Sequence, residues 1–249
     1  ISIYTNNDDG WETAKDLKKA GCNVVCIIDQ RSNIKPPVED IDHILGKNIV
    51  KAKGNLRISS ITLDNGRVIN TDCLAVSGGY NPNLHLTCHQ RGKPKWNEVN
   101  HCFVPHNPPK TMEVIGAANG LFNHEEMFND SKVKLTKILR NLGFRKIAVE
   151  KVNISKKVYQ VSPFPKKIPE GKIWVDLQND VTVKDIKLAV HEGFHSVELL
   201  KRYTTLGMAT DQGKNSNVLG LSVLSLIKNK TMNEVLNSVI QERNKMRDD

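Results

Sequence analysis

The first 31 residues, ISIYTNNDDGWETAKDLKKAGCNVVCIIDQR (1–31), decide the fold of this chain. After an apolar start and a polar turn, Ala14 and Leu17 stand at helical spacing, and Gly21 ends the helix. The run VVCII (24–28) is apolar and β-branched, as in a parallel strand that is buried on both faces. The order of strand, helix and strand predicts a βαβ unit and therefore an α/β fold with a parallel sheet.

The second strand ends at Asp29, where a dinucleotide-binding βαβ unit places an acid for a ribose hydroxyl, about 20 residues after the phosphate turn. Such an acid favours NAD over NADP because it repels a 2′-phosphate, and Arg31 weakens that preference. The turn, TNNDDG (5–10), lacks the glycines of a GxGxxG motif, and Asp8 and Asp9 would repel a pyrophosphate. Two interpretations stay open: a working dinucleotide site, or a dinucleotide-type fold whose turn no longer binds phosphate.

Two later segments end in small residues that would let a ligand approach the backbone. LRISSITLDNGRVIN (56–70) predicts a hairpin with its turn at Asn65 and Gly66, and the strand that follows, 73–76, ends in SGG. MEVIGAANG (112–120) predicts another strand that ends in the small residues GAANG. We expect the two strand ends to face one crevice.

The C-terminal part predicts a run of short helices. Residues with the types and spacing of N-terminal caps stand before three of them, namely Thr182 with Asp185, Ser196, and Thr231 with Glu234. Gly193 ends the first of these helices. A small helical domain is therefore expected to follow the sheet domain.

A polar loop, TTLGMATDQGKNSN (204–217), precedes another helix, which Asn215 or Ser216 can cap. Exposed amides at that helix start would suit a phosphate or the edge of a flavin. Three basic residues lie near it in the sequence: Lys201, Arg202 and Lys214. The alternative is a capped helical hairpin that binds nothing, and the residues alone weigh the two about equally.

The excess positive charge of the chain lies in one segment. The 249 residues carry a formal net charge of +9, and residues 131–172 hold 12 Lys/Arg against 2 Asp/Glu, or +10, which leaves −1 for the rest. The same segment contains Pro163, Pro165 and Pro169, which favours an interdomain connector. Nucleic-acid binding is the alternative, but no RNA-binding motif or aromatic stacking pattern supports it, so we expect no nucleic-acid partner.

Composition also argues against several classes of protein. No apolar run approaches the roughly 18 residues of a membrane-spanning helix, and the first residues do not resemble a signal peptide. The five cysteines form no CxxC pair, which argues against a disulfide framework or a zinc site. We expect no membrane partner, no metal, reduced thiols and a cytoplasmic location.

The order of βαβ unit, hairpin, SGG, strand and GAANG resembles the two-dinucleotide-domain flavoproteins of the disulfide-reductase class. In most of that class the second residue of the last motif is an acid that holds the flavin ribityl chain. Here that residue is Ala117, which argues against a flavin at this place.

A more specific resemblance begins with VDLQNDVTVKDIKLAVHEGFHSVELLKRYTTLGMATDQGKNSNVLGL (175–221), which closely resembles the middle of the alpha subunit of heterotetrameric sarcosine oxidases. Four other segments resemble the same family: IYTNNDDGWETAKDL (3–17), AVSGGYNPNLHL (75–86), RGKPKW (91–96) and IGAANG (115–120). The resemblance runs in the right order from Ile1 to about Asn233.

This resemblance implies a multi-subunit amine oxidase whose alpha subunit binds NAD. A beta-like flavoprotein subunit would carry the FAD that oxidises sarcosine, FMN would lie between the two subunits, and this chain would contribute no catalytic residue. Relatives with an iron–sulfur cluster carry four cysteines in the helical module, and their positions correspond here to Asp176, Gln178, Asp211 and Ser216. None of these can supply thiolate, so no iron–sulfur cluster is expected.

The expected organisation is an incomplete dinucleotide-binding α/β domain over 1–128, a basic connector over 129–172 and a helical domain over 173–249. The segments that precede and follow this region in the family have no counterpart in the 249 residues, so we expect a central fragment, a truncated product or one piece of a split subunit. We therefore also expect the isolated chain to be inactive and to bind NAD weakly. The alternative function is a non-catalytic assembly module without a cofactor.

Candidate cofactor-binding residues fall into three groups, and none is expected to be catalytic. They are Asn6, Asn7, Asp29, Arg31, Gly78 and Gly79 at the first turn and strand ends; Gly116, Ala117, Ala118 and Asn119 in GAANG; and Thr204, Thr205, Gly207, Thr210, Gln212, Gly213 and Lys214 in the helical loop.

Overall fold

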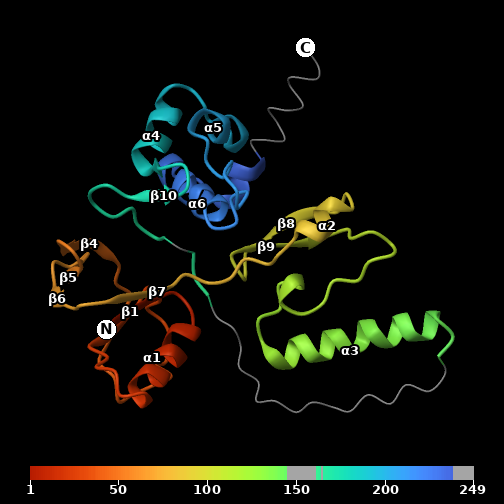
Figure 1. Cartoon of the computed structure of the whole chain (residues 1–249), viewed down its shortest axis with the longest axis horizontal. Helices are drawn as coiled ribbons and strands as arrows, with labels where there is room; N and C mark the ends of the chain where they lie inside the picture. The colour runs from red at the N-terminus through yellow and green to blue at the C-terminus, as the bar shows by residue number, and fades with distance from the viewer. Residues whose placement is uncertain (145–160, 164, 238–249) are drawn as a thin grey trace. The chain divides into compact units, whose positions relative to one another are not determined.

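The computed structural model describes residues 1–144, 161–163 and 165–237. The chain divides into two compact units (Figure 1), of which the first joins Ile1–Gly78 to Ser162–Asp249 and the second is Gly79–Val161. The first unit is thus built from both ends of the chain, with the second unit inserted between them. No helix in the described parts is long and apolar enough to cross a membrane.

A four-stranded parallel sheet forms the base of the first unit. Its strands are β1 (Ser2–Thr5), β2 (Cys26–Asp29), β3 (His43–Leu45) and β7 (Leu74–Ser77), in the order β3-β2-β1-β7. Helix α1 (Asp9–Lys19) connects β1 to β2, and Gly21, with φ of +83°, follows its end. The predicted βαβ unit and the α/β fold class are confirmed.

Both faces of β1 and β2 are buried, because each face packs against a different part of the unit. Successive side chains of a strand point to opposite faces, so neighbouring residues belong to different clusters. Ile3 and Ile27 pack with Trp11 of α1, whereas Tyr4 and Ile28 pack on the other face. The continuous apolar run in the sequence therefore reflects two different packing partners rather than one.

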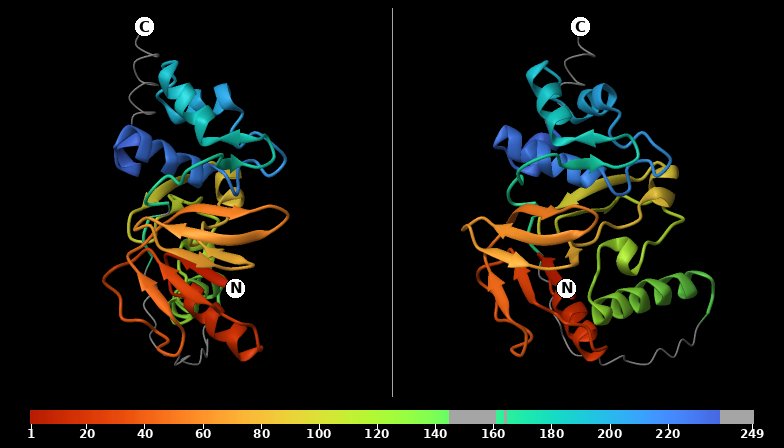
Figure 2. Two further views of the ribbon diagram at one scale, coloured as in Figure 1. Left: turned by 90° about the vertical axis from the view of Figure 1, so that its left-hand side faces the viewer. Right: turned by 60° about the vertical axis from the view of Figure 1, so that its left-hand side comes forward.

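The partner of that second face is a three-stranded antiparallel sheet, which Figure 2 shows in orange beside the parallel strands. Its strands are β4 (Ile49–Gly54), β5 (Ile58–Leu63) and β6 (Val68–Asn70). Ile61 and Leu63 are fully buried in the shared core. The hairpin between β5 and β6 is confirmed, and Gly66 has the positive φ that its turn requires.

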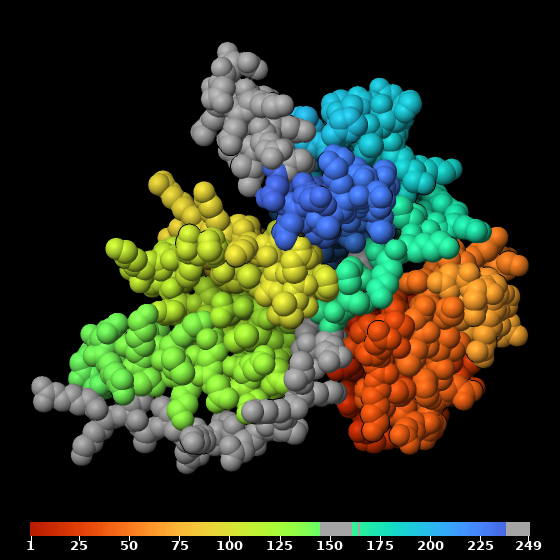
Figure 3. Space-filling view, turned by 180° about the vertical axis from the view of Figure 1, so that it is seen from behind, coloured from red at the N-terminus to blue at the C-terminus, as the bar shows by residue number. Residues whose placement is uncertain are grey.

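The helical part of the first unit begins with a short hairpin of β10 (Trp174–Asp176) and β11 (Val181–Thr182). Three helices follow: α4 (Val183–His191), α5 (Val197–Thr204) and α6 (Asn217–Lys228). The segment after residue 165 (teal in Figure 3) lies between α6 and the N-terminal strands. An apolar pocket of about 160 Å³ remains at this junction, between Tyr4 and Ile49 on the sheet side and Val175 and Val223 on the helical side.

Most of the predicted helix caps are confirmed. Thr182 and Asp185 form a reciprocal capping box, the Ser196 hydroxyl accepts from the Leu199 N–H, and the Glu234 carboxylate accepts from both the N–H and the hydroxyl of Thr231. The predicted cap of α6 is wrong in its chemistry. Ser216 occupies the N-cap position, but its hydroxyl donates to Asp176 instead of accepting from the helix.

The second unit contains a hairpin of β8 (Lys93–Asn97) and β9 (Cys102–His106), in which the rings of Trp96 and Phe103 meet edge to face. The short helix α2 (His85–His89) precedes it, and the 3-10 turn η1 (Gly116–Asn119) and helix α3 (His124–Asn141) follow it. α3 has no buried residue.

The strand predicted over 112–115 is not formed. Ile115 is extended, with φ of −127° and ψ of 160°, but no described strand pairs with it, and the small residues that follow form η1 instead. Extended backbone becomes a strand only when a neighbour completes the ladder of hydrogen bonds. The crevice expected to be shared with the end of β7 concerns both units and stays a prediction.

The division into two units differs from the domains expected from composition, 1–128, 129–172 and 173–249. α3 runs through residue 128, and the helical part belongs to the same unit as the parallel sheet. Much of the expected connector, 145–160 and 164, lies outside the described residues, so the connector stays a prediction.

Gly10 is the point at which α1 packs most closely on β1. A Cβ at this position would lie 2.4 Å from Thr5 Oγ1 and 2.5 Å from Thr5 Cβ. We predict that Gly10→Ala lowers the free energy of unfolding by about 1–3 kcal/mol, because the strand and helix must separate. Urea unfolding followed by circular dichroism would measure the change. Lys15→Ala on the exposed side of α1 is the control, at about 0.5 kcal/mol or less, and an equally stable Gly10→Ala protein would contradict the packing argument.

Candidate functional site

The turn between β1 and α1 keeps one part of the dinucleotide-binding fingerprint. Thr5, Asn7 and Gly10 stand at the spacing of the three glycines of GxGxxG. The third glycine of that motif allows close packing of helix on strand, and Gly10 has this role here. Thr5 and Asn7 replace the two glycines that make the tight turn and admit a pyrophosphate, which explains why the sequence motif is hard to see.

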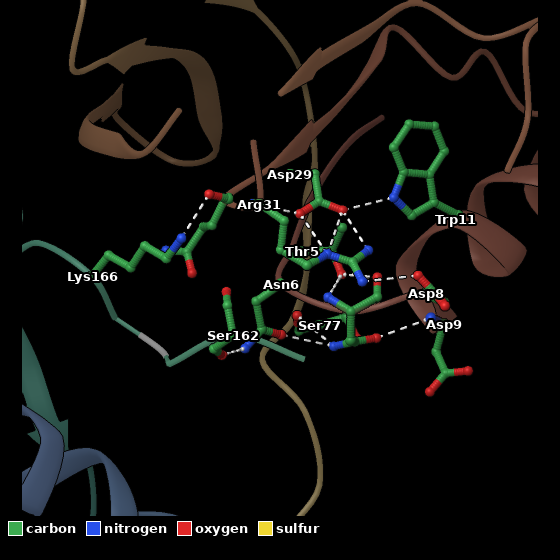
Figure 4. Close-up of polar contacts among 12 residues, drawn as sticks. Thr5, Asn6, Asp8, Asp9, Trp11, Asp29, Arg31, Ser77, Ser162 and Lys166 are labelled. Atoms are coloured by element: carbon green, nitrogen blue, oxygen red, sulfur yellow. Dashed lines mark hydrogen bonds and ion pairs between the residues drawn. The ribbon is translucent and has the colours of Figure 1, made fainter. Parts of the chain in front are cut away.

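Asp29 lies at the end of β2 with its side chain fully buried, as the sequence placed it. Its carboxylate is already hydrogen-bonded within the chain (Figure 4). Arg31 Nη2 lies 2.7 Å from Oδ2, Arg31 Nε donates to Oδ1 at 3.0 Å, and Trp11 Nε1 donates to Oδ2 at 2.8 Å. A ribose hydroxyl would have to replace one of these donors.

Arg31 joins the two ends of the βαβ unit. Besides Asp29, its guanidinium contacts Asp8 of the turn, with Nη1 2.9 Å from Oδ1. Burial by itself lowers the pKa of Arg31, but its hydrogen bonds and ion pairs with Asp29 and Asp8 outweigh burial and raise that pKa above the ordinary value. Asp8, expected to repel a phosphate, is thus neutralised by Arg31.

The carboxyl edge between β1 and β7 is closed by amide side chains. Asn6 Nδ2 donates to the Gly78 carbonyl at 3.1 Å, and Asn7 Nδ2 donates to the Ser77 hydroxyl at 3.0 Å. Asn7 Oδ1 accepts from the N–H of Asp9, the first residue of α1. The structure therefore brings Asn6, Asn7 and Gly78 together, and near them Asp29 with Arg31, as a hydrogen-bonded group.

The other candidate residues are distributed over both units. Gly116, Ala117, Ala118 and Asn119 form η1 in the second unit, where Asn100 Nδ2 donates to the carbonyl of Gly120 directly after it. Gly79 is the first residue of the second unit. These residues stay candidates without a described ligand-binding geometry.

The loop 204–217 of the helical part is arranged around one carboxylate. Asp176 Oδ2 accepts from the Gly207 N–H at 2.7 Å and from the Ser216 hydroxyl at 3.2 Å, while Oδ1 accepts from the Gln178 N–H at 2.9 Å. Burial alone would raise the pKa of Asp176, but these hydrogen bonds, with one from the Asn179 N–H, favour the charged form and lower the pKa. One side chain therefore fixes both ends of the loop.

Two glycines and one asparagine shape the middle of this loop. Gly207 and Gly213 have positive φ, and a Cβ on either would lie 2.2–2.3 Å from the Asn217 side chain. Asn217 Nδ2 donates to the Gln212 carbonyl, whereas its buried Oδ1 has no hydrogen-bond partner among the described residues. The loop thus presents an unsatisfied acceptor next to two glycines that cannot be replaced.

The candidate side chains of the loop differ in their hydrogen bonds within the chain and in their solvent exposure. The Thr204 hydroxyl donates to the Leu200 carbonyl, and Gln212 Nε2 donates to the Ala209 carbonyl. Thr205 has a positive φ of 62° and ends α5. Lys214 is exposed, and Lys201 on α5 is half-buried, which lowers its pKa through desolvation.

Cys26 and Cys102 are the two buried thiols among the five cysteines. No group of three His, Cys, Asp or Glu that could hold a metal occurs among the described residues. Burial raises the pKa of Cys102 to about 12 and also raises that of Cys26, so neither thiol is ionised at neutral pH.

Sequence reasoning missed several members of the buried turn network. Trp11 was recognisable only as an apolar helix residue, although its indole N–H needs an acceptor when buried. Ser162 and Lys166, which also reach this edge, come from more than 130 positions further along the chain. No local sequence signal marks such contacts.

The parallel sheet with its βαβ turn and small antiparallel insertion defines the class: an α/β fold of the dinucleotide-binding type. The L-proline dehydrogenase from P. horikoshii superposes with a TM-score of 0.61 over 94% of this chain and 46% of that one, and at 16% identity it shows the fold alone.

The particular relationship comes from the sequences. Residues 170–243 match the family model of the sarcosine oxidase A3 domain. The chain is 37% identical to sarcosine oxidase subunit alpha of Rhizobium meliloti (strain 1021), over 94% of its own length and 24% of that protein. It is 31% identical to the same subunit of Corynebacterium sp. (strain U-96), over 91% of its own length and 26% of that protein. The chain is therefore a homologue of sarcosine oxidase alpha subunits and spans about a quarter of their length, which confirms the resemblance found in the sequence.

The contribution of the buried ion pair between Arg31 and Asp29 to the free energy of unfolding can be tested by substitution. Arg31→Met should lower the free energy of unfolding by about 3–5 kcal/mol, because it leaves a buried carboxylate without its counter-charge. The double variant Asp29→Asn/Arg31→Met should lose less than Arg31→Met alone, since the charge is then absent. Urea unfolding measures both, and a double variant less stable than Arg31→Met would contradict the analysis.

The Asp176 carboxylate generates a pH-dependent prediction. Because its pKa is lowered in the folded state, its stabilisation is present above the ordinary aspartate pKa of about 4 and is lost as the pH falls through the folded pKa. Asp176→Asn should therefore cost about 1–3 kcal/mol at pH 7. The difference from wild type should shrink towards pH 3 in urea unfolding, whereas the exposed Glu192→Gln should change little at either pH. A difference independent of pH would refute the assignment.

Proposed function

We propose that this chain is the part of a sarcosine-oxidase-type alpha subunit that supplies cofactor contacts to a multi-subunit oxidoreductase. The observation that carries the proposal is the 37% identity over 94% of the chain to a sarcosine oxidase alpha subunit. Amine oxidation would take place at FAD on a beta-like flavoprotein subunit, so this chain needs no acid, base or nucleophile of its own. A cytoplasmic, hetero-oligomeric complex is part of the same proposal.

We place the FMN contacts in the loop 204–217, at the surface that would meet the beta-like subunit. The buried Asn217 Oδ1 supports this choice, because it has no hydrogen-bond partner among the described residues and is an acceptor suited to a flavin N–H or a ribityl hydroxyl. Gly207 and Gly213 allow close backbone approach, and the exposed Lys214 offers a positive charge to the FMN phosphate. FMN, when bound, would supply the redox chemistry, and the chain's residues would hold it in place.

The remaining polar groups of the loop would give neutral hydrogen bonds to the same ligand. The proposed set is Thr204, Thr205, Thr210 and Gln212. The Thr204 hydroxyl donates to the Leu200 carbonyl and accepts from the Leu206 N–H, which leaves it one lone pair for a ligand. Gln212 donates through Nε2, and its Oε1 is the acceptor proposed for the ligand.

We place the proposed NAD contacts at the carboxyl edge of the sheet, where open α/β folds bind dinucleotides. Asn6, Asn7 and Gly78 lie there, with Asp29 and Arg31 behind them. Gly79 and the residues Gly116–Asn119, which belong to the second unit, stay separate candidates for cofactor contacts. Asp29 does not fit a direct ribose contact in this conformation, because its oxygens are paired with Arg31 and Trp11.

The pairing of Asp29 with Arg31 and Trp11 favours the second candidate function, a non-catalytic assembly module. A turn in which the side chains of Asn6, Asn7 and Asp8 are hydrogen-bonded or ion-paired within the chain can stabilise the fold without a ligand. The two candidates are separated by comparing the absorbance spectra of complexes that contain the wild-type chain or a chain altered in the loop 204–217. The flavin content of the complex depends on loop residues only if this chain binds the flavin.

An iron–sulfur cluster does not fit the helical part. The carboxylate, amide, carboxylate and hydroxyl of Asp176, Gln178, Asp211 and Ser216 stand where such a cluster would need cysteines. Both carboxylate oxygens of Asp176 instead accept hydrogen bonds, from the N–H groups of Gln178 and Gly207.

The FMN assignment predicts the effect of reversing one charge. Lys214→Glu should weaken FMN retention in the assembled complex by about tenfold, because a carboxylate would replace a charge-assisted phosphate contact. Flavin released during gel filtration is measured by absorbance, with circular dichroism to verify folding. Equal flavin content in wild type and Lys214→Glu would remove FMN from this loop.

The matched control is Lys187→Glu, an exposed lysine on α4 of the same helical part, which should retain FMN like wild type. Lys166 is less suitable as a control, because its Nζ donates to the Gln30 carbonyl at 2.9 Å.

A further inference from the structure

A second segment of the chain lies across the carboxyl edge of the parallel sheet (Figure 4). We call Ser162, Pro163, Pro165 and Lys166 the strap. The Ser162 N–H donates to the Asn6 carbonyl at 3.1 Å, and Asn6 Nδ2 donates back to the Ser162 carbonyl at 2.6 Å. The strap therefore pairs with the first residue beyond β1, where the dinucleotide crevice of such a fold begins.

A second contact fixes the other end of the strap. Lys166 Nζ donates to the carbonyl of Gln30, the residue directly after β2, at 2.9 Å. The strap is thus anchored at the end of β1 through Ser162 and at the end of β2 through Lys166, the two strand ends that would face a dinucleotide. Asn6, which the strap contacts, is only 1% exposed.

The sequence of the strap suits this position. Proline fixes φ near −65° and keeps the residue before it extended, so Ser162 is biased towards the strand-like conformation in which it pairs with Asn6. The entropy lost on docking is correspondingly small. Local stiffness thus helps a short segment remain in place with few hydrogen bonds.

Two buried polar atoms, one in the strap and one in the residue whose carbonyl it contacts, have no hydrogen-bond partner among the described residues. These atoms are Ser162 Oγ and Gln30 Oε1, and Gln30 is 2% exposed. An unsatisfied buried acceptor or hydroxyl makes an arrangement less stable than a fully paired one. The Gln30 amide group lies beside Tyr4 and Asn48, to which its Nε2 donates, so only the Ser162 hydroxyl belongs to the strap itself. The strap is therefore held in place with one of its own buried polar groups unpaired among the described residues.

We propose that the strap is an intramolecular plug that occupies the dinucleotide crevice and must be displaced before a dinucleotide binds there. Displacement frees Asn6 Nδ2 and the Asn6 and Gln30 carbonyls for a ligand. The apparent affinity for the dinucleotide is then lowered by the fraction of molecules in which the crevice is open. This inference rests on the proposed NAD contacts, and it adds their regulation.

The test compares this chain with a variant whose strap is weakened without altering the crevice. Ser162→Pro removes the N–H that bonds to Asn6, and Lys166→Met removes the donor to Gln30. Calorimetric titration with NAD should show about tenfold tighter binding by the double variant than by wild type, since two hydrogen bonds no longer hold the plug. Lys187→Met, an exposed change on α4, should bind like wild type.

Hydrogen exchange of the Ser162 amide supplies an independent readout. The amide should be protected in the wild-type chain and lose protection when NAD is added in excess. Equal, measurable NAD affinity in wild type and the double variant would overturn the plug while leaving the NAD contacts intact. Absence of NAD binding by both proteins would reject the proposed NAD contacts and the plug with them.

Discussion

Asp29 ends a central parallel strand with a fully buried carboxylate, and a charge in that position must be neutralised and hydrogen-bonded where it lies. Arg31 and Trp11 provide both, and Arg31 also reaches Asp8 in the first turn. The start of α1, the end of β2 and the loop that follows are therefore held by one ionic group. Two of the glycines that usually leave this turn open for a pyrophosphate are replaced by Thr5 and Asn7, which form hydrogen bonds of their own with the turn and with Ser77.

The helical part is organised on the same principle, with a different carboxylate at its centre. Asp176 is the last residue of β10. Its carboxylate accepts from the Gly207 N–H and the Ser216 hydroxyl, which lie near the two ends of a loop without regular structure. A charged acceptor forms stronger hydrogen bonds than a neutral one, so one side chain can define the loop. The sequence resemblance puts a cysteine of iron–sulfur relatives at this position, and here a carboxylate holds the loop through hydrogen bonds.

Local patterns in the sequence were sufficient for the parts of the fold that depend on neighbouring residues. Apolar runs, Gly66 in its turn and the pairing of Thr182 with Asp185 each record a short-range requirement, and the structure confirms them. The failures have a different origin. The strand over 112–115 lacks a described neighbour, and the Ser216 hydroxyl is drawn to a carboxylate 40 positions away. The same limit applies to the candidate site: Asp29 could be placed from the sequence, but the residues that pair with its carboxylate could not.

The first unit is assembled from two stretches that are separated by Gly79–Val161. During synthesis, the strands of the parallel sheet are made well before Ser162 and the residues that complete the first unit. The carboxyl edge of the sheet therefore has no contact with Ser162 while the inserted unit is being translated. Closing so long an intervening loop costs entropy that grows only logarithmically with its length. The order of folding, rather than the final stability, is therefore what the insertion controls: the inserted unit can form first, and the enclosing unit is completed last.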